Sequence, residues 1–148
     1  MKLTIELVPR TSWFSNVRNE VSKKDWDIIR KASYLSAGYK CEICKDIGTN
    51  QGFRHKLECH EIWDFNDATN EQVLKGMISL CPKCHKVKHF GLAQMKGEHY
   101  MALDHLMKVN EMTQIEAEKY VSESFDIWAK RSEKEWKLNI SYLDENEK

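Results

Sequence analysis

Hydrophobic and polar residues alternate near both ends of the chain. In residues 2–8, Leu3, Ile5 and Leu7 are separated by polar side chains, and in residues 137–143 apolar side chains again recur at every second position. A period of two is typical of a β-strand with one buried face. Because a strand is not stable without a partner, we expect the two terminal segments to pair in one sheet.

Residues 22–37 show the spacing of a helix that buries one side. Ser22 offers the side-chain oxygen that caps a helix N-terminus, Asp25 follows three residues later, and Gly38 can end the helix in a left-handed conformation. The pattern predicts a helix that leads the chain directly to its first cysteine. We expect the buried stripe of this helix to consist of Trp26, Ile29, Ala32 and Leu35.

Two more helices are predicted in the C-terminal third. Residues 98–109 carry apolar side chains at helical spacing. Thr113 and Glu116 match a capping box, so a second helix should begin there and continue to residue 131. The apolar stripe of this second helix would be Ala117, Tyr120, Val121, Phe125 and Trp128.

The centre of the chain has the pattern of two strands followed by a helix. Residues 56–63 and 77–80 are short β-like runs, and the polar stretch 64–75 between them predicts a loop. A proline suits the first position of a helix over 82–90, and Gly91 is expected to end that helix. Together these elements predict the α+β fold class, with a hairpin that precedes a helix.

Four of the five cysteines form two Cys-x-x-Cys pairs, Cys41 with Cys44 and Cys81 with Cys84. Two such pairs are typical of a tetrahedral Zn²⁺ site, because one tight turn can supply two thiolates. Buried thiols or a redox pair are the alternatives, but the βαβ pattern of a thioredoxin-like motif does not accompany these cysteines. We therefore predict one structural Zn²⁺, with Cys59 left over.

Composition indicates an ordinary globular protein. Of the 148 residues, 31% are charged and 41% hydrophobic, and we expect residues 1–148 to form a single domain. No apolar run approaches the roughly 18 residues of a membrane span, and the first residues lack the apolar core of a signal peptide. Five cysteines without an export signal favour a reducing compartment, so we expect a cytoplasmic protein.

The net charge is zero, but the charges are unevenly distributed. Residues 1–56 carry eleven Lys or Arg against six Asp or Glu, whereas residues 98–148 carry seven against twelve. A basic half opposite an acidic half can steer a polyanion onto one face. Scattered surface charge is the alternative interpretation.

Histidines accompany the cysteine pairs. Cys59 and His60 lie between the two pairs, and His85 and His89 follow the last cysteine at a spacing that places both on one face of a helix. With two zinc-type pairs, a hairpin and a histidine-bearing helix, residues 39–91 resemble the HNH endonuclease family.

The resemblance implies an α+β fold around a treble-clef-type ββα-metal core. Residues 39–91 would form this HNH-like core with its four-cysteine zinc site. Residues 1–38 would add an N-terminal strand and helix, and residues 92–148 would add helices and a strand, so that the terminal elements wrap the core.

The resemblance also implies a mechanism. His60 matches the family's general base for hydrolysis of DNA phosphodiester bonds, while Cys59, His85 and His89 match the ligands of a catalytic or second metal. Mg²⁺, Mn²⁺, Ni²⁺ and Zn²⁺ all remain open as that second cofactor. The expected partner is double-stranded DNA, with phosphates contacted by Arg54, Lys56, Lys83, Lys86 and Lys88.

Two positions depart from the family's pattern. Gly76 stands about where the motif asparagine is expected, although Asn66 or Asn70 could substitute, and Cys59 replaces a harder ligand although thiolate prefers zinc to magnesium. Two other functions therefore stay open: a non-catalytic zinc-binding nucleic-acid module, and a protein-interaction scaffold that uses the acidic C-terminal half. No partner is predicted for His55, His99 and His105.

Overall fold

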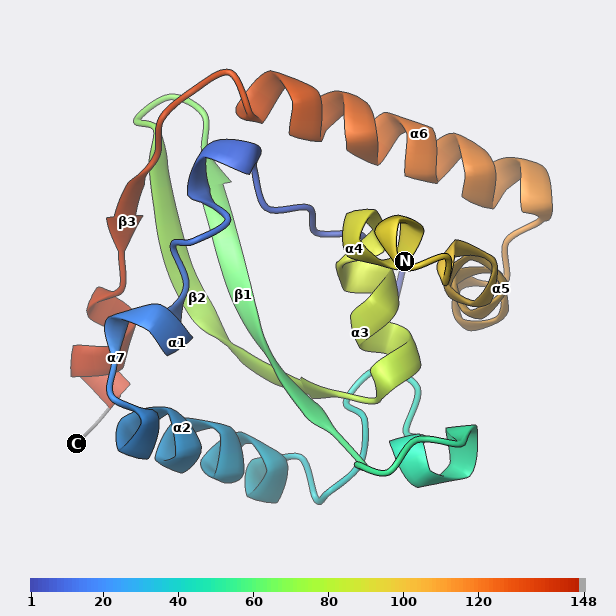
Figure 1. Cartoon of the computed structure of the whole chain (residues 1–148), viewed down its shortest axis with the longest axis horizontal. Helices are drawn as coiled ribbons and strands as arrows, with labels where there is room; N and C mark the ends of the chain where they lie inside the picture. The colour runs from blue at the N-terminus through green and yellow to red at the C-terminus, as the bar shows by residue number, and fades with distance from the viewer. Residues whose placement is uncertain (147–148) are drawn as a thin grey trace.

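The structure, a computed structural model, describes residues 1–146 and shows a mixed α+β protein built around a long β-hairpin (Figure 1). Helices α1, α2 and α7 lie on one side of the hairpin, and α3 to α6 lie on the other. The strands are β1 (Glu58–Asn66), β2 (Glu71–Leu80) and β3 (Lys137–Asn139). The helices are α1 (Val17–Glu20), α2 (Lys23–Ser36), α3 (Pro82–Lys88), α4 (Phe90–Met95), α5 (His99–Asn110), α6 (Gln114–Arg131) and α7 (Ser141–Asn146), with 3-10 turns η1 (Arg10–Ser12) and η2 (Gly48–Gln51).

Strands β1 and β2 pair antiparallel along their whole length, from Glu58 opposite Leu80 to Asn66 opposite Glu71. The hairpin is therefore longer than the sequence predicted, because much of the expected loop 64–75 belongs to the strands. Polar residues form the turn between the two strands. The side chain of Asn66 accepts two backbone hydrogen bonds within this turn, and Asn70 adopts the left-handed conformation with φ 58°.

The N-terminal segment is extended but belongs to no strand, so the predicted strand over residues 2–8 is wrong. Side chains take the place of a neighbouring strand. The Leu3 N–H donates to Asn110 Oδ1 at 2.9 Å, and Asn110 Nδ2 donates back to the Leu3 carbonyl at 2.7 Å. The Ile5 N–H donates to the Tyr120 hydroxyl at 2.9 Å. Leu3 and Ile5 are buried, as the alternation predicted.

The C-terminal segment also differs from the prediction. Only Lys137–Asn139 is a strand, and it pairs in parallel with the beginning of β2 rather than with the N-terminal segment. The chain then turns into α7, where the side chain of Asn139 accepts the N–H of Ser141 at 3.0 Å. Leu143 is buried on α7, so the alternating pattern over 137–143 reflects a short strand followed by a helical turn.

Helices α2, α5 and α6 form where the sequence predicted them. Ser22 caps α2, and Thr113 and Glu116 make both hydrogen bonds of the capping box of α6. The stripe of α2 is rotated relative to the prediction, because Ala32 and Leu35 are exposed. Its inward-facing residues include Trp26, Ile29, Ser33 and Tyr34; Ile29 follows Trp26 by three positions, and Ser33 follows Ile29 by four.

Helix α3 ends before Gly91. His89 has φ −105° and ψ 54°, which interrupts the helix, and α4 begins at the next residue, so Gly91 is helical instead of terminating the segment. The main core lies between this helix pair, α5, α6 and the N-terminal segment. A smaller core joins α1, α2 and α7 to the far side of the hairpin. No helix within residues 1–146 is long and apolar enough to cross a membrane.

The side-chain anchoring of the N-terminal segment generates a stability prediction. Asn110→Ala removes both hydrogen bonds to Leu3 and leaves two backbone groups without partners, so the free energy of unfolding should fall by about 1–3 kcal/mol. Urea denaturation measures this change. Gln94→Ala, an exposed change on α4, is the matched control, and equal stability of the two variants would contradict the proposed anchoring.

Candidate metal centres

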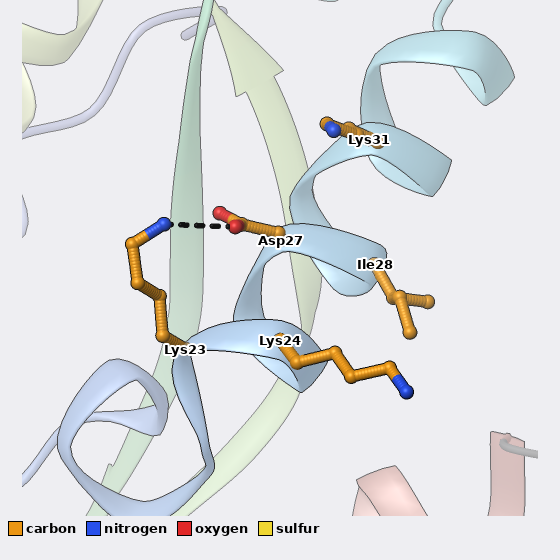
Figure 2. A pocket seen from close by; sticks show the side chains of 5 residues that line it. All are labelled: Lys23, Lys24, Asp27, Ile28 and Lys31. Atoms are coloured by element: carbon orange, nitrogen blue, oxygen red, sulfur yellow. Dashed lines mark hydrogen bonds and ion pairs between the residues drawn. The ribbon is translucent and has the colours of Figure 1, made fainter.

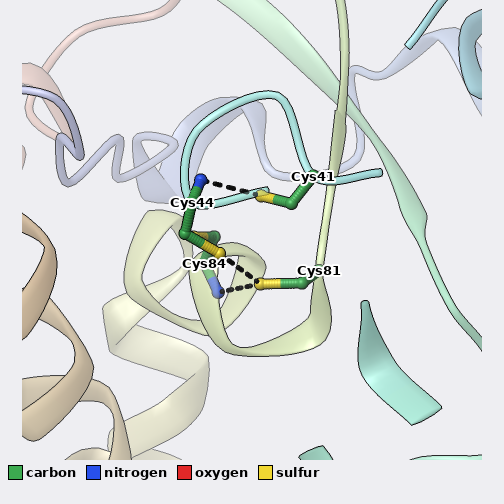
Figure 3. A group of neighbouring side chains, drawn as sticks. All are labelled: Cys41, Cys44, Cys81 and Cys84. Atoms are coloured by element: carbon green, nitrogen blue, oxygen red, sulfur yellow. Dashed lines mark hydrogen bonds between the residues drawn. The ribbon is translucent and has the colours of Figure 1, made fainter. Parts of the chain in front are cut away.

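The four paired cysteines come together at one end of the hairpin (Figure 3). Cys41 and Cys44 follow α2, whereas Cys81 precedes α3 as its N-cap and Cys84 lies in its first turn. All four Sγ atoms lie within 4.8 Å of one another, and Cys44 Sγ is 3.5 Å from Cys81 Sγ. Thiolates about 2.3 Å from a shared tetrahedral ion would be about 3.8 Å apart. The cluster can therefore hold a metal such as zinc.

Backbone groups support negative charge on these sulfurs. The Cys44 N–H points to Cys41 Sγ at 3.5 Å and the Cys84 N–H to Cys81 Sγ at 3.4 Å. The turn that brings the first pair together continues into Lys45, which is left-handed with φ 68°. Three of the four cysteines are fully buried, so a cation would be enclosed by its ligands.

The crowding of the thiols itself favours a cation. Hydrogen bonds within the cluster, first of all from Cys44, lower the pKa of Cys41 to about 6, and those from Cys41 and Cys44 lower the pKa of Cys81 well below its usual range. The same contacts, led by Cys41, raise the pKa of Cys44 and of Cys84. Four thiolates this close cannot all be ionised unless a positive charge lies among them. A divalent metal would supply that charge.

His105 is a member of this centre that the sequence did not reveal. Its Nε2 lies 3.1 Å from Cys84 Sγ, although His105 belongs to α5, well beyond the second pair. An imidazole N–H directed at a metal thiolate orients the ligand and moderates its charge. No spacing rule connects the two residues, because their proximity depends on how α5 packs against α3.

A second group forms from three histidines on the same hairpin and helix. His60 projects from β1, His85 from α3 and His89 from the residue that ends α3. Their ring centroids are 4.7–5.3 Å apart, and one ring nitrogen of each lies within 4.8 Å of the others. The pattern of the sequence thus pointed to all three members. Three neighbouring imidazoles are a donor set suited to Zn²⁺, Ni²⁺ or Mn²⁺.

Carboxylates lie beside two of these histidines. Glu58 Oε2 lies 2.8 Å from His85 Nδ1, which leaves His85 Nε2 free to face the other rings. Glu6 Oε1 lies 3.6 Å from His60 Nε2, and the other oxygen of Glu6 forms an ion pair with Lys88. Glu58 and His60 are two residues apart on β1 and therefore share a face.

Burial favours the neutral form of His60 and of His89. It lowers the pKa of His60, against the smaller opposing influence of Glu6, and it lowers the pKa of His89 to about 3. Burial alone would raise the pKa of Glu6, but the adjacent His60 and Lys88 outweigh it and lower that pKa to about 2. His60 Nε2 is buried and has no hydrogen-bond partner among the described residues. A neutral imidazole with an unsatisfied nitrogen fits a metal or a transferable proton.

Cys59 does not belong to the histidine group, so the predicted ligand set of Cys59, His85 and His89 needs correction. Cys59 and His60 are adjacent on a regular part of β1 and point to opposite faces. The thiol lies close to Ser33 of α2, and burial raises its pKa to about 11. Cys59 is a neutral, partly buried thiol on the α2 side of the sheet.

The predicted phosphate contacts also change. Lys88 is 5% exposed and binds Glu6 and Thr4, and Lys86 forms a 2.8 Å ion pair with Glu98. Both charges are used within the fold. The remaining three predicted contacts are open to solvent to different degrees: Arg54 and Lys56 are exposed and Lys83 is half-buried.

The position at which the resemblance to HNH endonucleases leads one to expect an asparagine offers no amide side chain. Gly76 pairs with Ile62 inside the hairpin, and a β-carbon added to it would lie 3.7 Å from the hydroxyl oxygen of Tyr142. Asn66 and Asn70 form the turn at the opposite end of the hairpin from the cysteines. Neither asparagine therefore replaces the missing group.

The histidines open into a cleft of about 720 Å³ between the N-terminal segment, β1, α4 and α6. Aromatic side chains line much of it, including Trp13, Trp63, Phe65 and Trp128.

A second, shallow hollow lies on the outer face of α2 (Figure 2), where Lys23 forms an ion pair with the carboxylate of Asp27 at 3.1 Å. This hollow is a basic surface, unlike the cleft, and contains neither of the two clusters. Its lining residues are Lys23, Lys24, Asp27, Ile28 and Lys31.

Neither a family model nor a curated protein nor a solved structure matches this chain. The two side-chain clusters therefore provide the indications of what the protein does.

The cysteine cluster generates a metal-content prediction. Cys41→Ser should remove the metal bound there and lower the melting temperature by more than about 10 °C, because metal binding at such a site contributes to folding and each kcal/mol lost shifts Tm by about 2–4 °C. Elemental analysis and thermal denaturation measure both effects. Cys59→Ser, the fifth cysteine, is the control and should keep its metal. A Cys41→Ser protein with unchanged metal content and Tm would refute the assignment.

Proposed function

We propose that this protein is an HNH-like, metal-dependent endonuclease that hydrolyses DNA phosphodiester bonds. The observation that best supports the proposal is the convergence of His60, His85 and His89 on a hairpin–helix unit whose ends are tied together by the four-cysteine cluster. A strand histidine that faces helix histidines is the arrangement expected of a ββα-metal core. The four-cysteine cluster would hold the structural Zn²⁺ of that core.

His60 is the proposed general base. Burial favours its neutral form, and its unsatisfied Nε2 is available to take a proton from an attacking water. Glu6 is ionised and 3.6 Å from the same nitrogen, so its carboxylate stabilises the imidazolium that forms. Lys88 keeps Glu6 in place through the buried ion pair. This chain of contacts gives roles to two residues outside the family's motif.

His85 and His89 are the proposed ligands of the second metal. A divalent cation bound there would neutralise charge on the phosphate and on the leaving oxygen. Glu58 accepts the Nδ1–H of His85 and thereby holds that ring with Nε2 toward His60 and His89. Imidazole ligands favour Zn²⁺, Ni²⁺ or Mn²⁺ over Mg²⁺. Cys59 has no part in this site.

A non-catalytic nucleic-acid-binding module is the second candidate function. The observation that favours it is Gly76, which offers no side chain where the motif asparagine would orient the base or touch the metal. In that case all three histidines would be ligands of a structural metal and none would be left to activate water. Hydrolysis of a phosphodiester by the purified protein separates the two functions.

The proposed base can be tested by substitution. His60→Ala should lower the rate of strand nicking, on plasmid or single-stranded DNA, in Mn²⁺, Ni²⁺ or Zn²⁺ by about 10²–10⁴-fold, because a positioned base contributes about that much to rate. The metal in the four-cysteine cluster should remain bound. His99→Gln, which changes a histidine of α5 outside both clusters, should cut normally. Wild-type nicking by His60→Ala would exclude this mechanism, and a wild-type protein inactive with every metal would favour the binding module.

The orienting role of Glu58 makes a distinct prediction. Glu58→Gln should weaken metal binding at the histidines by about 10–100-fold, the usual effect of losing a carboxylate behind a histidine ligand. A titration of nicking rate against metal concentration should show lower apparent affinity and recovery of the rate at excess metal. Glu61→Gln alters the opposite face of β1, where Glu61 accepts the Val17 N–H, and should leave the titration unchanged. Equal titrations for the two variants would contradict the role of Glu58.

A further inference from the structure

The three histidines lie at the floor of the cleft and not on an outer surface. His60 is 4% exposed. One wall of the cleft is the N-terminal segment, whose backbone is held by Tyr120 at Ile5, by Lys88 at Glu6 and by Trp128 at Val8. Because hydrogen bonds from α3 and α6 fix this wall, access to the histidines requires a substrate that enters the cleft.

A DNA duplex does not meet that requirement. Its phosphates lie on the outside of a rod that stays stiff over about 50 nm, so a duplex contacts convex or flat surfaces far more easily than a recess. A single strand has flexible phosphates and unstacked bases that can enter a groove one nucleotide at a time. The cleft, at about 720 Å³, lies in the size range of pockets that enclose small organic ligands, and it can enclose part of a strand.

The walls of the cleft carry the chemistry that recognises unpaired bases. Trp13 is 61% exposed at the rim and lies with its ring centroid 4.1 Å from that of Phe14. Trp63 and Phe65 follow on β1 and line the same cleft, and Trp63 also packs against the smaller core. Aromatic faces along a groove stack with bases of any sequence. An apolar binding site for a lipid or a peptide would not need a metal-binding floor.

Charge is available for the phosphates at the same opening. Arg18 lines the cleft, is exposed, and forms no ion pair among the described residues. The other arginine of the cleft, Arg131, is already paired with Asp67 at 3.2 Å. Glu6, the carboxylate nearest the histidines, is balanced by Lys88. Arg18 is therefore the cation of the cleft that a phosphate can recruit.

The edge of β1 that does not face β2 also borders the cleft. In the strand order β1-β2-β3 of the described residues, β1 lies at the edge of the sheet and pairs with β2 (Figure 1). Residues from both faces of β1 line the opening. Unpaired backbone N–H groups can donate to phosphates. The same edge could bind an extended peptide as a further strand. Binding of a peptide strand would not account for Arg18 or for the three histidines in the cleft.

We propose that the cleft binds single-stranded DNA, with bases stacked on Trp13 and Trp63, a phosphate held by Arg18, and the next phosphodiester directed to the histidines. The cleavage of that strand rests on the proposed endonuclease function, whereas its binding does not. In the cleavage step a water oxygen bonds to phosphorus, the bond from phosphorus to one sugar oxygen breaks, His60 takes the proton of the water, and solvent protonates the leaving oxygen. In this proposal the bound DNA is a single strand, whereas the sequence led us to expect a duplex.

Fluorescence anisotropy with a labelled mixed-sequence strand of about 12 nucleotides, a length within the site sizes of single-strand grooves, tests the binding. The His60→Ala protein, which should not consume the DNA, is expected to bind this strand at least about ten times more tightly than the corresponding duplex. Trp13→Ala and Arg18→Gln, each introduced into that protein, should weaken single-strand binding by about fivefold or more, because each removes a stacking or phosphate contact. The matched controls are Tyr100→Ala, an exposed aromatic residue outside the cleft, and Lys24→Gln, a cation on the outer face of α2; both should bind as before.

Equal affinity for strand and duplex would overturn the inference, and so would unchanged binding by both Trp13→Ala and Arg18→Gln. Absence of binding to either DNA would overturn it as well and would favour an extended peptide at the edge of β1. The endonuclease function is tested separately by hydrolysis of bis(p-nitrophenyl) phosphate, a small diester that enters the cleft without base pairing. If the wild-type protein binds the strand but hydrolyses no diester with any divalent metal, the proposed function fails while the single-strand site stands.

Discussion

The close packing of four cysteine sulfurs is the constraint on which the remaining structure depends. Thirty-six residues separate Cys44 from Cys81, and the whole hairpin lies within that interval. A cation among the four sulfurs would turn their mutual repulsion as thiolates into a crosslink between the loop after α2 and the first turn of α3. The start of α3 would then be fixed relative to β1. His105 adds α5 to the same centre through its contact with Cys84.

Such a crosslink would also hold the histidine group together. With α3 beside β1, its two histidines meet His60, which points toward them from the strand. Each of two neighbouring carboxylates contacts one histidine: Glu58 forms a hydrogen bond with His85, and Glu6 faces His60. Glu6 reaches this position because the N-terminal segment is drawn across the main core by hydrogen bonds from α5 and α6. The same segment makes the histidines a recessed site.

Local chemistry was predictable from the sequence, and long-range packing was not. Ser22 and Thr113 act on adjacent backbone groups, so the starts of α2 and α6 follow from a few residues. The alternation in 2–8 predicted which residues are buried but not that side chains would replace a strand as hydrogen-bond partners. Cys59 was wrongly predicted to be a metal ligand beside His60, because adjacent residues on a strand point to opposite faces. Lys88 was wrongly predicted to contact phosphate, because a lysine on a helix is usually exposed and this one is buried. The partners that only the structure reveals are Glu6, Glu58 and His105.

The central claim is that one hairpin–helix unit carries two metal centres, a closed one of four cysteines and an accessible one at the histidines. Anomalous diffraction from crystals of the protein grown with Zn²⁺ locates metal atoms directly. The account predicts one peak about 2.3 Å from the sulfurs of Cys41, Cys44, Cys81 and Cys84 and a second peak about 2.0–2.1 Å from nitrogens of His85 and His89. A single peak at the cysteines, with the histidines bonded to one another or to water, would contradict it.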